Sequence, residues 1–202
     1  MTVNKPVFGI TGASGSGKSY ISGIFRSYGI DVIDADTIGH YVTSPEGAAY
    51  GELKQHFGTD IFDSSGNLVR SRLAEIVFSD KKELCILNEI THKHIKSEIY
   101  SIIKNSPSPS VGIDGAVIIG SPVEAMCDFI IGVIAKEQLR IKRIVLRDGI
   151  TQDKAKLRLK SQPSDDFFRS RCRYIIDNSG GDVRSAVEKI ILENNLLGVK
   201  NS

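Results

Sequence analysis

The stretch Gly12-Ala13-Ser14-Gly15-Ser16-Gly17-Lys18-Ser19 matches the pattern G-x-x-x-x-G-K-[ST] at every fixed position. The apolar run 6–11 before it predicts a buried strand, and residues 20–26 after it carry apolar side chains at helical spacing. A strand, a glycine-rich loop and a helix in this order form the setting in which such a loop binds phosphate. The stretch therefore predicts a nucleotide-binding α/β protein rather than a glycine-rich turn without function.

The residues of this loop have separate expected roles. The glycines let the backbone N–H groups of residues 12–19 turn toward a polyphosphate, and the helix N-terminus adds partial positive charge. We expect Lys18 to reach the β- and γ-phosphates and the hydroxyl of Ser19 to ligate Mg²⁺. Tyr20 follows directly and is included in the predicted nucleotide-binding segment.

The composition, 41% hydrophobic and 25% charged, is ordinary for a soluble globular protein. No apolar run approaches the length of a membrane span, and residues 1–5 lack the features of a signal sequence, so we expect a cytoplasmic protein without a membrane partner. Cys85, Cys127 and Cys172 are widely spaced and form no C-x-x-C pair. This pattern predicts reduced, buried thiols rather than disulfides or a zinc site.

Positive charge is concentrated late in the chain. The formal net charge is only +2, whereas the segment 136–173 holds twelve Lys or Arg against five Asp or Glu, a local charge of +7. In a nucleotide-binding protein we interpret such a segment as a phosphate clamp, and the alternative is a solvated helical face. No nucleic-acid recognition motif accompanies the segment, so a nucleic-acid partner is not expected.

The rest of the chain alternates between predicted strands and helices. Strands are expected at 29–33, 111–119, 129–134 and 174–177, and helices at 136–147, 151–159, 165–173 and 183–192. Residues 37–105 have a helical pattern that is interrupted by a turn at 60–67. Together with the first strand, this order predicts a doubly wound parallel sheet of about five strands, with ligands beyond the carboxyl ends of the strands.

Acidic residues follow two of these strands. Asp36 is the best candidate for a catalytic base, because a carboxylate at a strand end could accept a proton from an attacking hydroxyl or organise Mg²⁺. It could equally be the N-cap of a helix that begins at Thr37. Asp34 could cap or bind metal while Asp36 acts as the base. Asp114 is a loose match to the second acidic element of P-loop metal sites.

Three arginines are expected on one helix face, because Arg140, Arg143 and Arg147 are spaced three and four residues apart. The planar guanidinium suits the equatorial oxygens of a transferring phosphoryl group. A mobile basic segment that closes over a nucleotide would deliver such arginines. The alternative is that they pair at the surface with Asp148 and Asp153.

Several spaced features together resemble the dephospho-CoA kinase family. The loop alone is not specific to that family, whereas the other elements jointly are. They are Asp34-Ala35-Asp36, the block RSRLAEIVF at 70–78, LNEITH at 87–92, Asp114, Arg143 with Arg147-Asp148-Gly149, Ala155 with Arg158 and Gln162, and IIDNSG at 175–180. They run through nearly the whole chain.

The resemblance implies ATP- and Mg²⁺-dependent phosphorylation of the ribose 3′-hydroxyl of dephospho-CoA, which gives CoA in the last step of its biosynthesis. It implies one P-loop kinase domain over 1–202, with a helical substrate-binding region at 37–105 and a basic lid at 148–173. A kinase for another small metabolite, such as a nucleoside or nucleotide, and a nucleotide-binding member without transfer activity are the alternatives.

The resemblance also assigns residues by position. Asp36 matches the family's base, Lys18 its phosphate contact, Arg143 and Arg147 its lid-side arginines, and Asn178 lies in the segment expected near adenine. The residues assigned to the acceptor substrate are Asp36, Arg72, His92 and Asp114. Several positions depart from the family pattern, mostly on the substrate side: Tyr20, Lys93, Ala116, Gly120 and Arg173.

Overall fold

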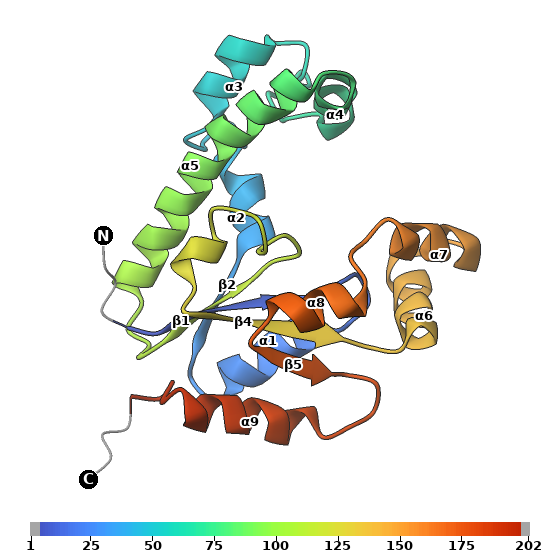
Figure 1. Cartoon of the computed structure of the whole chain (residues 1–202). Coiled ribbons are helices and arrows are strands. Elements are labelled where there is room, and N and C mark those ends of the chain that lie inside the picture. Colours follow the sequence, from blue (N-terminus) through green and yellow to red (C-terminus); the bar gives the residue numbers. More distant parts are fainter. Residues whose placement is uncertain (1–4, 199–202) are drawn as a thin grey trace. The chain divides into compact units, whose positions relative to one another are not determined.

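The computed structural model describes residues 5–198, and in this part of the chain five parallel strands form one sheet (Figure 1). The strand order is β2-β3-β1-β4-β5, so β1 lies in the middle between two strands that come much later in the chain. The strands are β1 (Val7–Thr11), β2 (Asp31–Asp34), β3 (Val111–Asp114), β4 (Phe129–Ile134) and β5 (Tyr174–Asp177). The expected doubly wound parallel sheet is confirmed.

Helices cover both faces of this sheet: α1 (Lys18–Ser27) and α9 (Val183–Glu193) lie on one face and α8 (Asp165–Arg171) on the other (Figure 1). After β4 the chain forms α6 (Glu137–Asp148) and α7 (Gln152–Lys160). The remaining elements are α2 (Ala35–Val42), α3 (Tyr50–Phe57), α4 (Arg70–Ser79), α5 (Lys81–Asn105) and the short 3₁₀ helix η1 (Glu124–Met126).

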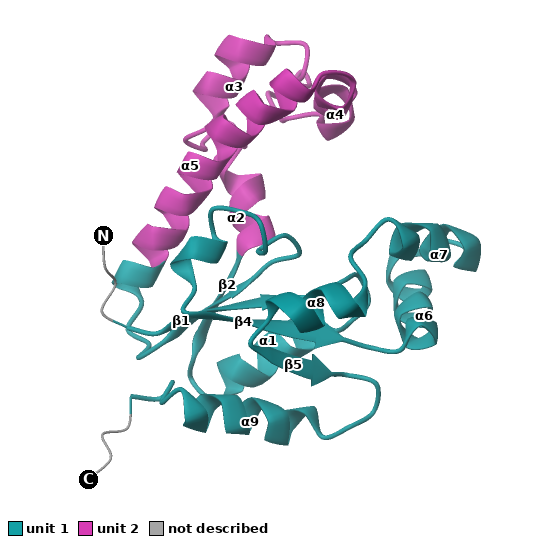
Figure 2. Ribbon diagram, in the orientation of Figure 1, with its two compact units in different colours: residues 1–34, 103–202 teal, residues 35–102 magenta. Residues whose placement is uncertain are grey.

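The chain divides into two compact units, which Figure 2 colours separately. The first, here called the core unit, comprises residues 1–34 and 103–202, and the second, the helical unit, comprises residues 35–102. Each has its own hydrophobic core. The core of the helical unit consists of Val42, Ala49, Leu53, Ile61, Phe62, Leu73, Val77 and Ile90.

The core of the core unit is centred on β1 and β4, in which every residue is buried. Central parallel strands are covered on both faces, which is why their sequences are nearly continuous apolar runs. Phe8 is fully buried, with its ring centroid 5.6 Å from that of Phe129 and 4.7 Å from that of Phe25. Burial of a side chain of this size contributes about 1.5–3 kcal/mol to stability.

Two expected strands have different bounds in the structure. The strand expected at 111–119 ends at Asp114, because the chain then turns: the Ser121 N–H donates to the Ile118 carbonyl at 3.0 Å, and Ile118 is buried without strand pairing. The strand expected from Gly29 begins at Asp31. Gly29 has φ +79° and follows the C-cap of α1, with its N–H donating to the Arg26 carbonyl at 3.0 Å.

Two further expectations concern the cysteine side chains and membrane-spanning helices. Cys85, Cys127 and Cys172 are free, as expected, but Cys85 is exposed and the other two are only half-buried, so the prediction of three buried thiols is wrong. Burial raises the pKa of the Cys127 thiol to about 12 and that of Cys172 to about 11. Within residues 5–198, no helix has the length and apolar character needed to cross a bilayer.

Candidate active site

The phosphate loop joins β1 to α1 and depends on glycine at two positions in particular. Gly15 has φ +76° and Gly17 has φ +96°, values that residues with a Cβ rarely adopt. Space is also restricted: a Cβ on Gly17 would lie 2.1 Å from Nδ2 of Asn178, and one on Gly15 would lie 2.7 Å from the Arg140 carbonyl oxygen. Glycine is therefore required at both positions, for the backbone conformation and for the close approach of Arg140 and Asn178.

Replacing Gly17 by alanine should destabilise the fold by about 2–4 kcal/mol, since strained backbone and a steric clash add together. ATP affinity should fall as well, because the loop amides lose their directions. Gly23→Ala is the matched control: nothing lies within 4 Å of a Cβ there, so this helical position should gain about 0.5–1 kcal/mol. Denaturant unfolding and titration calorimetry would measure both effects, and equal stability of the two variants would contradict the prediction.

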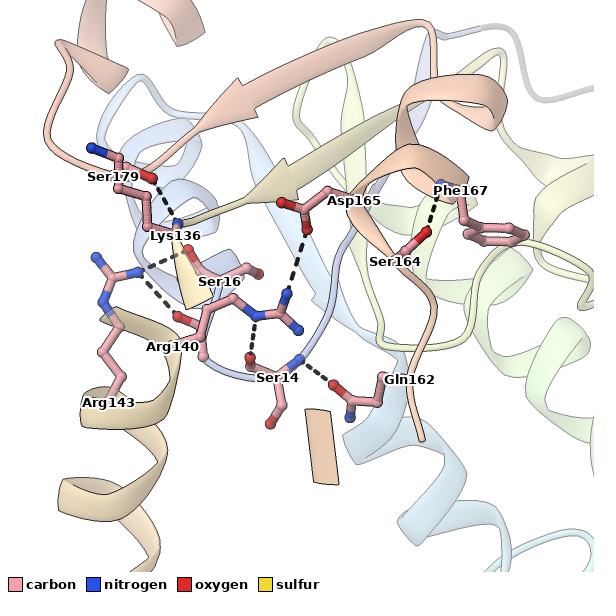
Figure 3. A network of polar contacts seen from close by, with 11 residues as sticks. Ser14, Ser16, Lys136, Arg140, Arg143, Gln162, Ser164, Asp165, Phe167 and Ser179 are labelled. Atoms are coloured by element: carbon pink, nitrogen blue, oxygen red, sulfur yellow. Dashed lines mark hydrogen bonds and ion pairs between the residues drawn. The ribbon is translucent and has the colours of Figure 1, made fainter. Parts of the chain in front are cut away.

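Side chains of later segments bind the carbonyl groups of the loop (Figure 3). Nε of Arg140 donates to the Ser14 carbonyl at 3.2 Å. Nη1 of Arg143 donates to the carbonyls of Gly15 at 3.0 Å and Ser16 at 3.1 Å. Nδ2 of Asn178, which directly follows β5, donates to the Ser16 carbonyl at 2.9 Å. Three consecutive loop carbonyls are thus held by α6 and by the end of β5.

Ser14 is the point at which the basic segment contacts the loop most fully. Its backbone N–H donates to Oε1 of Gln162 at 2.8 Å, and its hydroxyl accepts a hydrogen bond from Nη2 of Arg147 at 3.3 Å. With the Arg140 contact, each polar atom of Ser14 contacts a different residue of the segment 136–173. Because Ser14 N–H is a donor, the carboxamide oxygen of Gln162 must face it.

Arg140 is buried, with 7% of its surface exposed, and buried charge requires partners. Besides the Ser14 carbonyl, its Nη1 lies 3.4 Å from Oδ1 of Asp165, in the first turn of α8. The N-cap of α8 is Ser164, whose hydroxyl accepts the Phe167 N–H (Figure 3). Arg140 therefore connects α8 to the phosphate loop from within the protein.

Arg147 and Arg158 both pair with Asp148 at the junction of α6 and α7. The hydrogen bond from Arg147 is the main cause that lowers the pKa of Asp148 to about 2. The expected surface pairing with Asp148 is thus present for Arg147, in addition to its contact with Ser14. Asp153 pairs with Lys156 at 3.9 Å, not with one of the three arginines of α6.

Acidic groups lie at the carboxyl ends of β2 and β3, where Asp34 and Asp114 are register partners. Oδ2 of Asp114 accepts a hydrogen bond from the Ser22 hydroxyl at 2.8 Å. Because α2 begins at Ala35, Asp36 lies inside its first turn, and the interpretation of Asp36 as the N-cap of a helix beginning at Thr37 is wrong. A carboxylate in a first turn is favoured by the helix dipole.

The residues assigned to the acceptor lie on separate helices of the helical unit, apart from Asp114. Asp36 is on α2, Arg72 on α4 and His92 on α5. Nη1 of Arg72 donates to the carbonyls of Asp60 and Phe62, each at 2.9 Å, which fixes the turn before α4. Burial lowers the pKa of His92 below its ordinary value.

Nζ of Lys18 donates to the Gly12 carbonyl at 2.9 Å, across the loop, while Ser19 and Tyr20 are exposed in the first turn of α1. Within the described residues, no cluster of three His, Cys, Asp or Glu side chains is suited to hold a metal ion. A cation bound beside Ser19 would therefore need nucleotide and water oxygens as further ligands, which is how Mg²⁺ is usually bound.

Some contacts of the site were not expected from the sequence. The hydrogen bond between Ser22 and Asp114 could have been predicted from helical spacing, since Ser22 lies three residues after Ser19 and on the same helix face. Gln162 belongs to the elements that resemble the family, but its sequence position does not indicate a contact with the Ser14 N–H. No sequence signal indicated that Asn178 would bind the Ser16 carbonyl.

Comparison with known proteins gives consistent matches. A family model described as dephospho-CoA kinase matches residues 6–183. The dephospho-CoA kinase of Corynebacterium diphtheriae is 33% identical over 93% of this chain and 94% of its own length, and that of Carboxydothermus hydrogenoformans is 32% identical over 92% and 91%. A solved dephospho-CoA kinase from Campylobacter jejuni superposes with a TM-score of 0.64 at 26% identity, covering 94% of this chain and 96% of that one.

Proposed function

Because the chain belongs to the dephospho-CoA kinase family, we propose that it transfers the γ-phosphoryl group of ATP to the ribose 3′-hydroxyl of dephospho-CoA. The observation that carries the proposal is the phosphate loop of residues 12–19, with its carbonyls held by α6 and Asn178, in a chain that matches the family model over 6–183. We infer that residues 37–105 bind the acceptor and that 148–173 form the lid.

The triphosphate would be bound by the loop and the start of α1. The N-terminus of α1 carries partial positive charge and directs its first backbone N–H groups, those of Lys18 and Ser19 among them, toward a bound phosphate. The Lys18 ammonium adds a positive charge at the β- and γ-phosphates. Tyr20 continues this segment, and Asn178 lies at the edge of the loop where we place the adenine side of the nucleotide.

The residues present fit a magnesium ion. The Ser19 hydroxyl and the carboxylates of Asp34 and Asp114 are oxygen groups at one edge of the core unit, and hard cations prefer such ligands. Asp114 would also face the acceptor, as its position in the family pattern implies. A bound Mg²⁺ would neutralise charge on the phosphate oxygens.

The transfer step assigns Asp36 as the base. The 3′-hydroxyl oxygen forms a bond to the γ-phosphorus, the bond from that phosphorus to the leaving ADP oxygen breaks, and the hydroxyl proton passes to the Asp36 carboxylate. Arg147 is the lid-side arginine that we assign to the charge on the transferring group. Arg72 and His92 would contact the acceptor from the helical unit.

Incubation of the protein with ATP and dephospho-CoA should produce CoA, and removal of Mg²⁺ with EDTA should stop the reaction until Mg²⁺ is restored. Liquid chromatography with mass spectrometry would identify the product. Nucleosides and nucleotides offered as acceptors in parallel should give no comparable turnover. Phosphorylation of one of these, with none of dephospho-CoA, would contradict the proposal.

A further inference from the structure

We propose that Arg143 is a positioning residue: it fixes two peptide units of the phosphate loop from outside and does not bind the phosphates itself. This inference refines the proposed function, on which its turnover arm rests. Nη1 of Arg143 donates to the Gly15 and Ser16 carbonyls, and its Nη2 donates to the Asn178 carbonyl at 3.1 Å. A guanidinium Nη carries two N–H bonds, so both of those on Nη1 are engaged by the loop.

The direction of a carbonyl sets the direction of the next amide. In a trans peptide, C=O of one residue and N–H of the next point to opposite sides. With the Gly15 and Ser16 carbonyls turned toward Arg143, the N–H groups of Ser16 and Gly17 point away from it. The Ser16 N–H donates to the Ala13 carbonyl at 3.1 Å and closes a turn within the loop. We infer that the Gly17 N–H, turned away from Arg143, is directed to a bound phosphate oxygen.

Asn178 completes this arrangement. Its Nδ2 binds the same Ser16 carbonyl, and its own N–H donates to the Ile134 carbonyl at 2.8 Å, which anchors it to β4. Gly17 permits this approach because it has no Cβ. Ser16 is 1% exposed, so its carbonyl has little access to water if Arg143 is removed.

The three acceptors also explain why this position suits arginine. A planar fork can serve carbonyls of Gly15, Ser16 and Asn178 at once, whereas the compact ammonium of lysine is a point charge on a flexible stem. We therefore assign Arg143 to holding the loop, and not to direct contact with the transferring phosphoryl group as expected of a lid-side arginine. Arg147, one turn later on α6, touches only the Ser14 hydroxyl of the loop.

The test compares Arg143→Ala and Arg143→Lys with Lys142→Ala, which removes the same charge from an exposed neighbouring position. Calorimetry would measure the affinities for inorganic pyrophosphate and ATP, and steady-state kinetics would measure kcat and KM. Both Arg143 variants should lose affinity for pyrophosphate and ATP by a similar factor, about 10- to 100-fold, since charged hydrogen bonds to the loop are lost. At saturating ATP, kcat should change less than about threefold.

Free guanidinium ion at low millimolar concentration should restore part of the pyrophosphate affinity of Arg143→Ala, and Lys142→Ala should retain normal affinity. A collapse of kcat with unchanged pyrophosphate affinity would overturn the inference in favour of direct phosphoryl contact. A lowered melting temperature with unchanged affinity would show a merely structural role and would overturn it too. The binding arm needs no acceptor, so failure of CoA formation by the native protein would reject the proposed function alone.

Discussion

Replacing Asp36 by asparagine should lower kcat by about 10²- to 10⁴-fold, the range that a positioned general base contributes. Asparagine keeps the size of the side chain but has no carboxylate to take the hydroxyl proton. ATP affinity should stay within about twofold, because the loop that binds ATP comes from a different part of the chain. Steady-state kinetics with dephospho-CoA and calorimetry with ATP would measure the two quantities.

Asp31→Asn provides the control for this variant. Asp31 begins the same strand that ends just before Asp36, and it accepts a hydrogen bond from the Ser106 hydroxyl at the opposite end of β2. The same chemical change there should leave kcat unaltered, because it removes the charge from a surface hydrogen bond far from the loop. Near-normal turnover of Asp36→Asn would exclude Asp36 as the base and direct attention to Asp34 or Asp114.

Replacing Lys18 by alanine should impair binding and turnover together. The ammonium lies 2.9 Å from the Gly12 carbonyl, which places it across the loop rather than in solvent. Its loss should weaken ATP binding by about 10- to 100-fold, as expected for charged hydrogen bonds. It should also lower kcat by about 10²- to 10³-fold, because positive charge at the transferring phosphoryl group is lost as well.

Lys189→Ala serves as the matched variant for Lys18→Ala. Lys189 lies on α9 with 75% of its side chain exposed, and it pairs only loosely with Glu193 at 3.8 Å. It should alter neither ATP affinity nor kcat. Should Lys18→Ala bind ATP as tightly as the native protein, the assignment of Lys18 to the β- and γ-phosphates would be wrong, even if turnover fell.

Local patterns predicted most of the fold. Some elements can be recognised from a few consecutive residues, and the structure confirms them: the loop, the buried strand β4 and the short strand at 174–177. The prediction was wrong at 115–119, where the chain turns after Asp114, so that Ile118 is buried whereas Val117 is exposed. A run of apolar side chains indicates burial, but strand pairing depends on partners elsewhere in the chain.

The chemistry of the site was less accessible from sequence. The loop pattern indicated which amides would face a phosphate, but not what would hold its carbonyls. Arg143 appeared as one of three arginines on a helix face, and only the three-dimensional path of α6 shows that its donors meet Gly15 and Ser16. The contact of Asn178 with Ser16 joins residues 162 positions apart, which no local pattern records.

The central position of β1 has a consequence for how the protein is made. Val7 pairs with Val111 and Phe8 with Phe129, so both neighbours of the first strand are translated late. Translation proceeds at about 5–20 residues per second, so β3, the first strand that pairs with β1, is synthesised roughly 5–20 s after β1. Meanwhile the helical unit, contiguous in the chain, can complete its core. Refolding from denaturant, where all strands are present at once, and synthesis on the ribosome therefore follow different routes.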